Sequence, residues 1–517
     1  MARLHRPKTS TKVAIVALAA AASLLLAGCA GAATAATGKS AVLKWGFSLP
    51  TSWDPVTSST GNDINTISLV YASLTKLNPE GKAEPGLATS WKYNKSGDAV
   101  TFTLRPGLTF SDGTALDANA VKESLLRGQT QTNSLLKDQL STIKSIAVVD
   151  KTHVTLNLVQ PDYQVPNLLA GKTGAIVSPK AFATSKSTAG IPTNPDGAGP
   201  FKFKSFVPES NAVLVKNDNY WDAKDVHIDE LDLSVAPDPS TVIAAVQTGS
   251  LDVASLPATE IAAAKAAGLK VDVVNSLTVS QVDVNSTLAP LTNAKVVEAL
   301  KYAVDREQLL KVANAGVGSV TYQPFPKGYI AYNPSLDTEY AYDPTKARAL
   351  LAAAGIKPGT LTITITAQAY SQATAELVQS QLKKVGVDAK IALVPVGSST
   401  WQQSVYLART AQFALDGTVG RESPVQNLGV VYGPTGLMNT SRSASPDFLA
   451  ALDKVRETPL DSPDYASVLQ SAVKLGVLQA SSFSLYSTPR IDVRSPKVSA
   501  LPHYLSQFRW EGVTVKQ

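Results

Sequence analysis

Cys29 is the residue whose type and position point most directly to chemistry, because it is the only cysteine among the 517 residues of the chain. It directly follows Leu26-Ala27-Gly28, at the end of an apolar run that begins at Val13. With a single cysteine, no disulfide can form within the chain. Basic residues without a single acid precede the run, which is typical of the start of a secretory signal peptide.

The Leu-Ala-Gly-Cys sequence resembles the lipobox of bacterial lipoproteins, in which the cysteine receives a diacylglycerol thioether and becomes the new N-terminus. This resemblance implies a lipoprotein signal peptide at residues 1–28, a flexible tether at 29–40, and a lipid on Cys29 that holds the protein to the outer face of the cell membrane. The apolar run would rise only about 21 Å as a helix, too little for a bilayer core of roughly 30 Å. An ordinary signal peptide with an incidental cysteine is the alternative.

The charge of the chain after Cys29 is close to balanced. The whole sequence has 47 Lys and Arg against 41 Asp and Glu, and four of the basic residues precede Cys29. No basic cluster interleaved with aromatic residues occurs, so no nucleic-acid partner is expected. No second long apolar segment occurs either, and the lipid is the only membrane attachment that the sequence predicts.

Strand and helix patterns alternate along the chain and predict an α/β fold. In the segment Leu361–Val394, two stretches of alternating apolar residues flank a helical stretch that ends at Gly386. A strand, a helix and a strand joined this closely predict a parallel pair with a right-handed crossover. Asp343-Pro344 predicts a helix that begins with an N-cap and a proline. Asp305 and Gln308 have the spacing of a capping box.

Five sequence blocks follow one another in a specific order. They are Glu84–Trp91 with Arg105–Thr114, Gly197–Phe203 with Asn217–Trp221, Gly249–Val253, Lys295–Arg306, and Tyr342–Pro344 with Leu350–Gly355. This series resembles the extracytoplasmic solute-binding proteins of peptide, oligopeptide and nickel ABC importers, which form solute-binding protein family 5. The resemblance covers essentially all of residues 42 to 517.

The resemblance implies an α/β, two-lobed periplasmic-binding-protein-like fold of type II, cluster C, with an extra inserted domain and a hinge between the lobes. Lobe I is expected at residues 41–72, 197–278 and 483–517, the inserted domain II at 73–196, and lobe II (domain III) at 279–482. The segments that cross between the lobes are expected near Leu277–Val284 and Phe483–Arg490.

Ligand binding in this family resembles strand addition, in which protein backbone pairs with an extended peptide and hydrated pockets accept its side chains. The matching stretch predicts ligand contacts at Asp416, Thr418, Val419, Gly420 and Arg421. In peptide-binding members an acid of this motif pairs with the α-amino group, whereas this chain has Arg421 there and Thr418 in place of a tryptophan. An arginine favours carboxylate, phosphate or sugar hydroxyls and repels an ammonium. Two alternatives stay open, namely that Glu422 replaces the acid or that Arg421 is a solvated loop charge.

Further ligand contacts are predicted where aromatic residues flank irregular segments rich in Gly, Ser and Pro. These candidates are Trp53, Trp401, Tyr406 and Tyr432, together with Ser58 in the segment after Trp53 and Tyr322 in a loop that the family places near the cleft. The tryptophans in the patterned blocks, Trp91, Trp221 and Trp510, are expected to lie in cores.

The resemblance implies a monomeric receptor that captures a peptide-like or other small polar solute and delivers it to ABC permease subunits and their ATPases. No cofactor or metal is expected, because His153, His227 and His503 are far apart in the sequence, which disfavours nickel binding. The absence of G-x-S-x-G and H-E-x-x-H motifs disfavours a secreted hydrolase. The alternatives are a receptor for an acidic or sugar-like solute and a scavenging or sensing receptor that serves no transporter.

Overall fold

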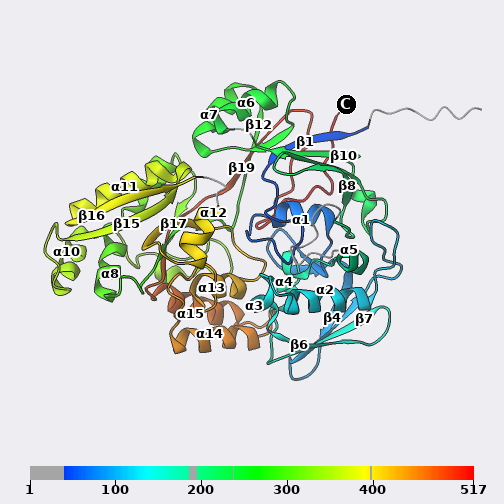
Figure 1. The fold of residues 1–517 in the computed structure, drawn as a ribbon, viewed down its shortest axis with the longest axis horizontal. Coiled ribbons are helices and arrows are strands. Elements are labelled where there is room, and N and C mark those ends of the chain that lie inside the picture. The colour runs from blue at the N-terminus through cyan, green and yellow to red at the C-terminus, as the bar shows by residue number, and fades with distance from the viewer. Residues whose placement is uncertain (1–39, 185–194, 237, 396–398, 517) are drawn as a thin grey trace, which may run out of the picture. The chain divides into compact units, whose positions relative to one another are not determined.

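The computed structural model describes residues 40–184, 195–236, 238–395 and 399–516 (Figure 1). The predicted signal peptide, Cys29 and all but the last residue of the predicted tether lie outside these residues. The described residues form sheets of seven, six, four and two strands.

The seven-stranded sheet has the order β12-β19-β11-β1-β10-β9-β8 and draws its strands from distant parts of the sequence (Figure 1). Strand β1 pairs in parallel with β10 and β11, and the outer pairs are antiparallel. The strands are β1 (Val42–Phe47), β8 (Phe201–Val207), β9 (Asn211–Lys216), β10 (Glu230–Val235), β11 (Val253–Ser255), β12 (Lys270–Val274) and β19 (Arg490–Arg494). Helices α1 (Ile64–Val70), α6 (Pro239–Gln247) and α7 (Ile261–Ala266) pack against this sheet.

The six-stranded sheet has the order β14-β18-β13-β17-β15-β16. Its strands are β13 (Val279–Val284), β14 (Ser319–Val320), β15 (Leu361–Gln368), β16 (Val387–Val394), β17 (Phe413–Thr418) and β18 (Ser482–Ser487). The helices of this part are α8 (Ala294–Ala303), α9 (Arg306–Ala313), α10 (Pro344–Ala353), α11 (Gln372–Lys384), α12 (Ser399–Trp401), α13 (Pro424–Tyr432), α14 (Pro446–Glu457) and α15 (Tyr465–Val477).

A four-stranded antiparallel sheet, in the order β4-β5-β7-β6, has a core of its own. The strands are β4 (Ala88–Tyr93), β5 (Ala99–Leu104), β6 (Ile143–Val148) and β7 (His153–Leu158), and the hairpin β2 (Thr75–Leu77) and β3 (Ala83–Pro85) precedes them. The helices of this part are α2 (Ala118–Thr130), α3 (Lys137–Leu140), α4 (Val165–Leu168) and α5 (Pro179–Thr184).

The chain passes between the two large sheets in two places. Strand β12 belongs to the seven-stranded sheet and the next strand, β13, to the six-stranded sheet, so the first crossing lies at residues 275–278. The second lies at residues 488–489, between β18 and β19. Two short connections of this kind are the geometry from which a hinge can be built.

Several local predictions are confirmed. Strands β15 and β16 pair in parallel over their whole length, and α11, which joins them, packs on both (Figure 1). Asp343 caps α10 by accepting hydrogen bonds from two backbone N–H groups. The predicted capping box is only half formed: Asp305 accepts from the backbone N–H of Gln308 (3.0 Å), but its own N–H donates to Gln381 Oε1 (3.0 Å). The side chain of Gln381 therefore takes the place expected for Gln308.

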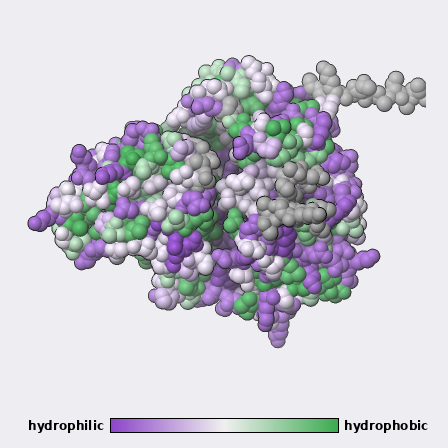
Figure 2. Space-filling view, in the orientation of Figure 1, coloured by the Kyte–Doolittle hydropathy of each residue, from purple (hydrophilic) through white to green (hydrophobic). Residues whose placement is uncertain are grey.

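Each large sheet carries its own apolar core, dominated by Trp45 and Trp510 in the seven-stranded part and by Phe413 and Phe448 in the six-stranded part. Figure 2 shows hydrophilic and hydrophobic residues interspersed over the visible face. Among the described residues, no helix combines the length and apolarity that a membrane crossing requires.

Candidate binding cleft

A cavity of about 760 Å³ lies between segments that are distant in the sequence. One wall is formed by the loop before α1 and by residues around α3 and α4, and the other by the connection after β17 and the helices α13 and α14. We call this cavity the cleft. Its volume falls in the range of small-molecule binding sites.

The two walls of the cleft are in direct contact through hydrogen bonds. Gln164 Oε1 accepts from the hydroxyl groups of Ser423 (3.3 Å) and Tyr465 (3.1 Å). Gln426 Nε2 donates to Gln139 Oε1 (2.7 Å). These bonds join the parts that a hinge would separate, so the structure has a closed cleft.

Arg421 lies between β17 and α13 and lines the cleft. Its Nε atom is buried without a partner, and its guanidinium makes no hydrogen bond or ion pair to any described residue. A Cβ atom added at Gly61 would lie 2.1 Å from Arg421 Nη1, so the loop before α1 packs directly against the guanidinium. Burial lowers the pKa of Arg421, but an arginine side chain keeps its charge in proteins.

Lys172 places a second positive charge in the same region of the cleft. Its ammonium donates to the carbonyl (2.8 Å) and hydroxyl (3.1 Å) oxygens of Ser58 and to the carbonyl oxygen of Thr60 (3.1 Å). Burial, followed by the charge of Arg421, lowers the pKa of Lys172 to about 8. Because all three donors are in use, Lys172 contributes charge to the cleft rather than a free donor.

Glu422 is the acid next to Arg421, and burial raises the pKa of its carboxyl group. A Cβ atom added at Gly171 would lie 2.0 Å from Glu422 Oε1. Among the described residues the carboxylate forms no ion pair with Arg421, although the two are adjacent in the chain. The missing side chain of Gly171 therefore leaves the space that the Glu422 carboxyl group occupies.

Two of the predicted contacts, Ser58 and Arg421, line the cleft. Val419 lies beside them, because a Cβ atom at Gly61 would approach its Cγ2 to 2.8 Å. Thr418 donates to Asn427 Oδ1 (3.0 Å) and is buried. Gly420 has a φ of 77° and faces Leu277.

Four other candidates lie in the core of the six-stranded sheet. The rings of Trp401 and Tyr406 make an edge-to-face contact, the Tyr406 hydroxyl donates to Asp416, and Tyr432 packs edge to face on Phe448. Burial raises the pKa of both Tyr406 and Asp416. None of these side chains is among those that line the cleft.

The last two candidates also lie away from the cleft lining. Trp53 is 4% exposed and packs edge to face against Phe203 at 4.7 Å, in the core of the seven-stranded sheet. Tyr322 is stacked under the guanidinium of Arg306, 4.6 Å from the ring centre. A contact between ligand and these side chains stays a prediction that would require them to move.

Lys172, Gln164 and Gln426 were not predicted, although each lines the cleft. No local pattern in the sequence marks them, because none of them belongs to a motif and their partners are distant in the chain. Gly61 and Gly171 are the residues in the sequence that could have indicated the cleft. Their role, which is to leave space for side chains of the opposite wall, is seen only in the structure.

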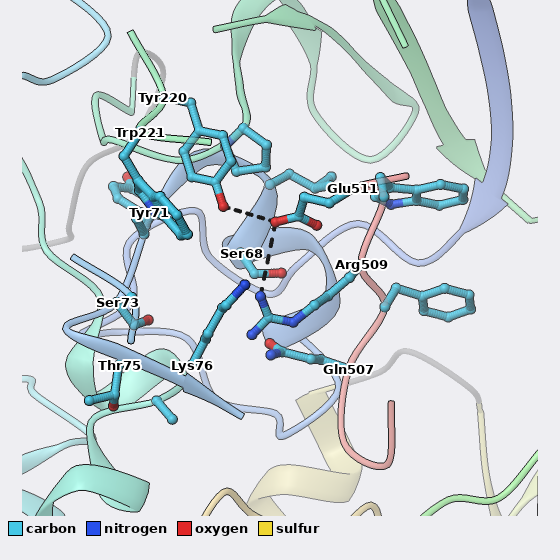
Figure 3. Close-up of a pocket in the computed structure, with 17 residues that line it drawn as sticks. Ser68, Tyr71, Ser73, Thr75, Lys76, Tyr220, Trp221, Gln507, Arg509 and Glu511 are labelled. Atoms are coloured by element: carbon cyan, nitrogen blue, oxygen red, sulfur yellow. Dashed lines mark hydrogen bonds and ion pairs between the residues drawn. The ribbon is translucent and has the colours of Figure 1, made fainter. Parts of the chain in front are cut away.

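A second cavity, of about 50 Å³, lies among Tyr71, Lys76, Tyr220 and Glu511 (Figure 3). The Tyr220 hydroxyl donates to Glu511 Oε1 (2.9 Å), and Arg509 lies 4.0 Å from the same oxygen. A water molecule occupies about 30 Å³ in the liquid, so this space accepts no more than a few waters. Of these two cavities among the described residues, the cleft is the one with room for a solute.

The sequence matches a family model. The model for bacterial extracellular solute-binding proteins, family 5 (middle), matches residues 82–436, which is more than half of the chain. The glutathione-binding protein GsiB of Salmonella paratyphi A is 32% identical over 332 residues. That alignment covers 63% of this chain and 64% of the relative, slightly less than two thirds of the relative's length.

Solved structures share the fold. The ABC transporter-associated periplasmic binding protein DppA of Helicobacter pylori, in complex with the peptide STSA, has a TM-score of 0.83 at 22% identity and covers 92% of this chain and 98% of its own. AgaA of A. tumefaciens R10, in complex with agropinic acid, has a TM-score of 0.81 at 24% identity and covers 92% and 99%. The predicted two-lobed α/β fold is confirmed, and these proteins are binding proteins rather than enzymes, as expected here. The chain belongs to the family 5 bacterial extracellular solute-binding proteins.

Proposed function

We propose that this protein is the substrate-binding component of an ABC importer, which captures a peptide-like or other small polar solute in the cleft and delivers it to the permease. The observation that carries the proposal is the cavity of about 760 Å³ that has charged and polar residues on both walls. Solute-binding proteins of this architecture enclose ligand by hinge motion, and the two crossings at 275–278 and 488–489 supply the hinge.

The names of similar proteins support a small polar ligand. They mention glutathione, a peptide and agropinic acid. Of the predicted contacts, Ser58, Val419 and Arg421 have the best support, because they line the cleft or lie beside it. The domain boundaries given above are part of the proposal. Strand β18 (Ser482–Ser487) pairs in the six-stranded sheet, so the last crossing is better placed at residues 488–489 than at the proposed start of the final lobe I segment, 483.

Transport is tested by deletion of the gene. Uptake of the solute that the purified protein binds should fall to background in the deletion strain and return when the gene is restored. A thermal-shift screen with glutathione, short peptides and sugar acids identifies the solute, because a specific ligand stabilises the folded state by mass action. Unchanged uptake of every bound solute would favour the alternative of a scavenging or sensing receptor.

We also propose that the mature protein is held on the outer face of the cell membrane by lipid on Cys29. Cys29→Ser removes the only thiol and with it the site of the thioether. The variant should appear in the medium or in the soluble extracytoplasmic fraction, whereas the wild type should stay with the membrane. Equal membrane retention of both proteins would contradict the anchor.

A further inference from the structure

Three polar atoms that line the cleft are buried and lack hydrogen-bond partners. They are the donor Nε of Arg421, the donor Nε2 of Gln164 and the acceptor Oε1 of Gln426. The assignment of the Gln164 amide follows from its other end, which accepts from two hydroxyl groups. A buried polar atom without a partner costs stability, so atoms of this kind in a binding cavity mark where a ligand bonds.

Two other charged groups near Arg421, Lys172 and Asp63, have hydrogen-bond partners within the protein. Lys172 donates three hydrogen bonds, to Ser58 and Thr60. Asp63, the acid beside it, accepts from the hydroxyl groups of Ser58 (2.6 Å) and Thr60 (2.7 Å). Arg421 is thus the charged side chain of this region whose donors are free among the described residues.

We propose that the solute carries a carboxylate group and that Arg421 binds this group in the cleft. This inference rests on the proposed function. A planar guanidinium matches a carboxylate through two parallel hydrogen bonds. A neutral hydroxyl would offer the guanidinium a single acceptor and no opposite charge.

The test compares matched acids and amides on the wild type and on Arg421→Gln, which keeps a polar side chain without the charge. Acetate and acetamide are the smallest probes, and they report on a carboxylate site whatever the rest of the solute is. Tri-alanine and its C-terminal amide, and glucuronate and glucose, then distinguish a peptide from a sugar acid as the source of the carboxylate. Melting temperature and calorimetry are measured at constant ionic strength.

We expect acetate to stabilise the wild type more than Arg421→Gln, and acetamide to stabilise neither. The larger acid that fits the cleft should lose about ten- to a hundredfold in affinity on this substitution, as expected for a charge-assisted bond. The empty Arg421→Gln protein should be at least as stable as the wild type, because a buried donor without a partner has been removed.

Arg442→Gln is the matched control. Arg442 also lines the cleft, but its guanidinium already donates to the carbonyl oxygens of Thr435 (2.6 Å) and Gly436 (2.8 Å). This variant should lose stability and still prefer acids over amides. Equal acetate effects on wild type and Arg421→Gln, or amides that bind as tightly as acids, would overturn the proposal.

The proposed function is judged separately, by compaction of the protein on binding. Compaction with a neutral solute would leave the proposed function intact, whereas no compaction with any solute would contradict it.

Discussion

At the scale of single residues, the cleft depends on how Arg421 is placed. The residue departs from the acid that the family resemblance implies at this position. In the structure its Nε atom is buried without a partner and its Nη1 atom lies against Gly61. Both alternatives left open by the sequence stay predictions, and the buried Nε atom of Arg421 speaks against a fully solvated guanidinium. Glu422 as the recognising acid stays a prediction, and this residue also lines the cleft.

Arg421→Asp should reverse the charge preference of the cleft. An aspartate at this position attracts an ammonium and repels a carboxylate, so affinity should shift toward solutes with a free amine by about tenfold or more. Calorimetry with tri-alanine, N-acetyl-tri-alanine and tri-alanine amide measures the shift. Identical preferences in wild type and variant would place the recognition of charge elsewhere, with Glu422 as the next residue to substitute.

At the scale of elements, the centre of the six-stranded sheet carries an unusual polar face. Asp283 on β13 and Asp416 on β17 lie on neighbouring strands, where Gln281 pairs with Asp416, and Gln281 Nε2 donates to Asp283 Oδ1 (2.6 Å). Burial raises the pKa of both carboxyl groups, and the proximity of Asp416 raises that of Asp283 further. The pair therefore favours a protonated state in the folded protein.

Asp283→Asn should stabilise the protein near neutral pH. The folded pKa of Asp283 is raised above the unfolded value, so its contribution to stability is present at low pH and is lost as the pH rises through the folded pKa. An asparagine keeps the shape, cannot ionise and can donate to Asp416. The free energy of unfolding should rise by roughly 1 to 3 kcal/mol near pH 7, with a flatter dependence on pH.

Urea unfolding over a series of pH values measures this effect. Asp388→Asn serves as the control, because Asp388 is exposed on the outer strand β16. A loss of stability in Asp283→Asn at neutral pH would mean that the ionised carboxylate is needed in the fold.

At the scale of the whole folded part, closure of the cleft requires two residues without side chains. Gly171 and Gly61 lie on the same wall of the cleft. Gly171 faces the carboxyl group of Glu422 on the other wall, and Gly61 faces Arg421 and Val419 there. The Gly171 backbone has φ −135° and ψ −142°, so no left-handed φ demands a glycine there, and the atoms of Glu422 fill the space that a side chain would need.

Gly171→Ala should hinder closure. The added methyl group would lie 2.0 Å from Glu422 Oε1 and 2.4 Å from its Cδ, and the buried acid has little room to move. Solute affinity should fall, and small-angle scattering with saturating solute should show a larger radius than the wild type. Gly429→Ala adds the same methyl group to the cleft lining in α13, where nothing lies within 4 Å, and should close normally.

Glu422→Ala in the Gly171→Ala background removes the atoms that clash and should restore compaction. Normal compaction of Gly171→Ala alone would show that the Glu422 side chain can leave this space at little cost.

The sequence by itself determined the features that arise from neighbouring residues. Strand β15, helix α11 and strand β16 follow from the spacing of apolar residues, which repeats every two residues in the strands and about every 3.6 residues in the helix. The N-cap of α10 follows from an aspartate whose carboxylate reaches N–H groups two and three residues ahead. The ordered blocks were enough to identify the family, because they record the order of these local units.

Only the tertiary structure decided which side chains meet in the cleft. Trp53, Trp401 and Tyr432 have the composition of ligand contacts but pack in cores, while Lys172, Gln164 and Gln426 carry no local signal and line the cavity. Lys172 approaches Arg421 because the part containing the four-stranded sheet and the part containing the six-stranded sheet close on each other. Such contacts join residues far apart in the chain, and the periodicity of a single segment contains no information about the partner that its polar face will meet.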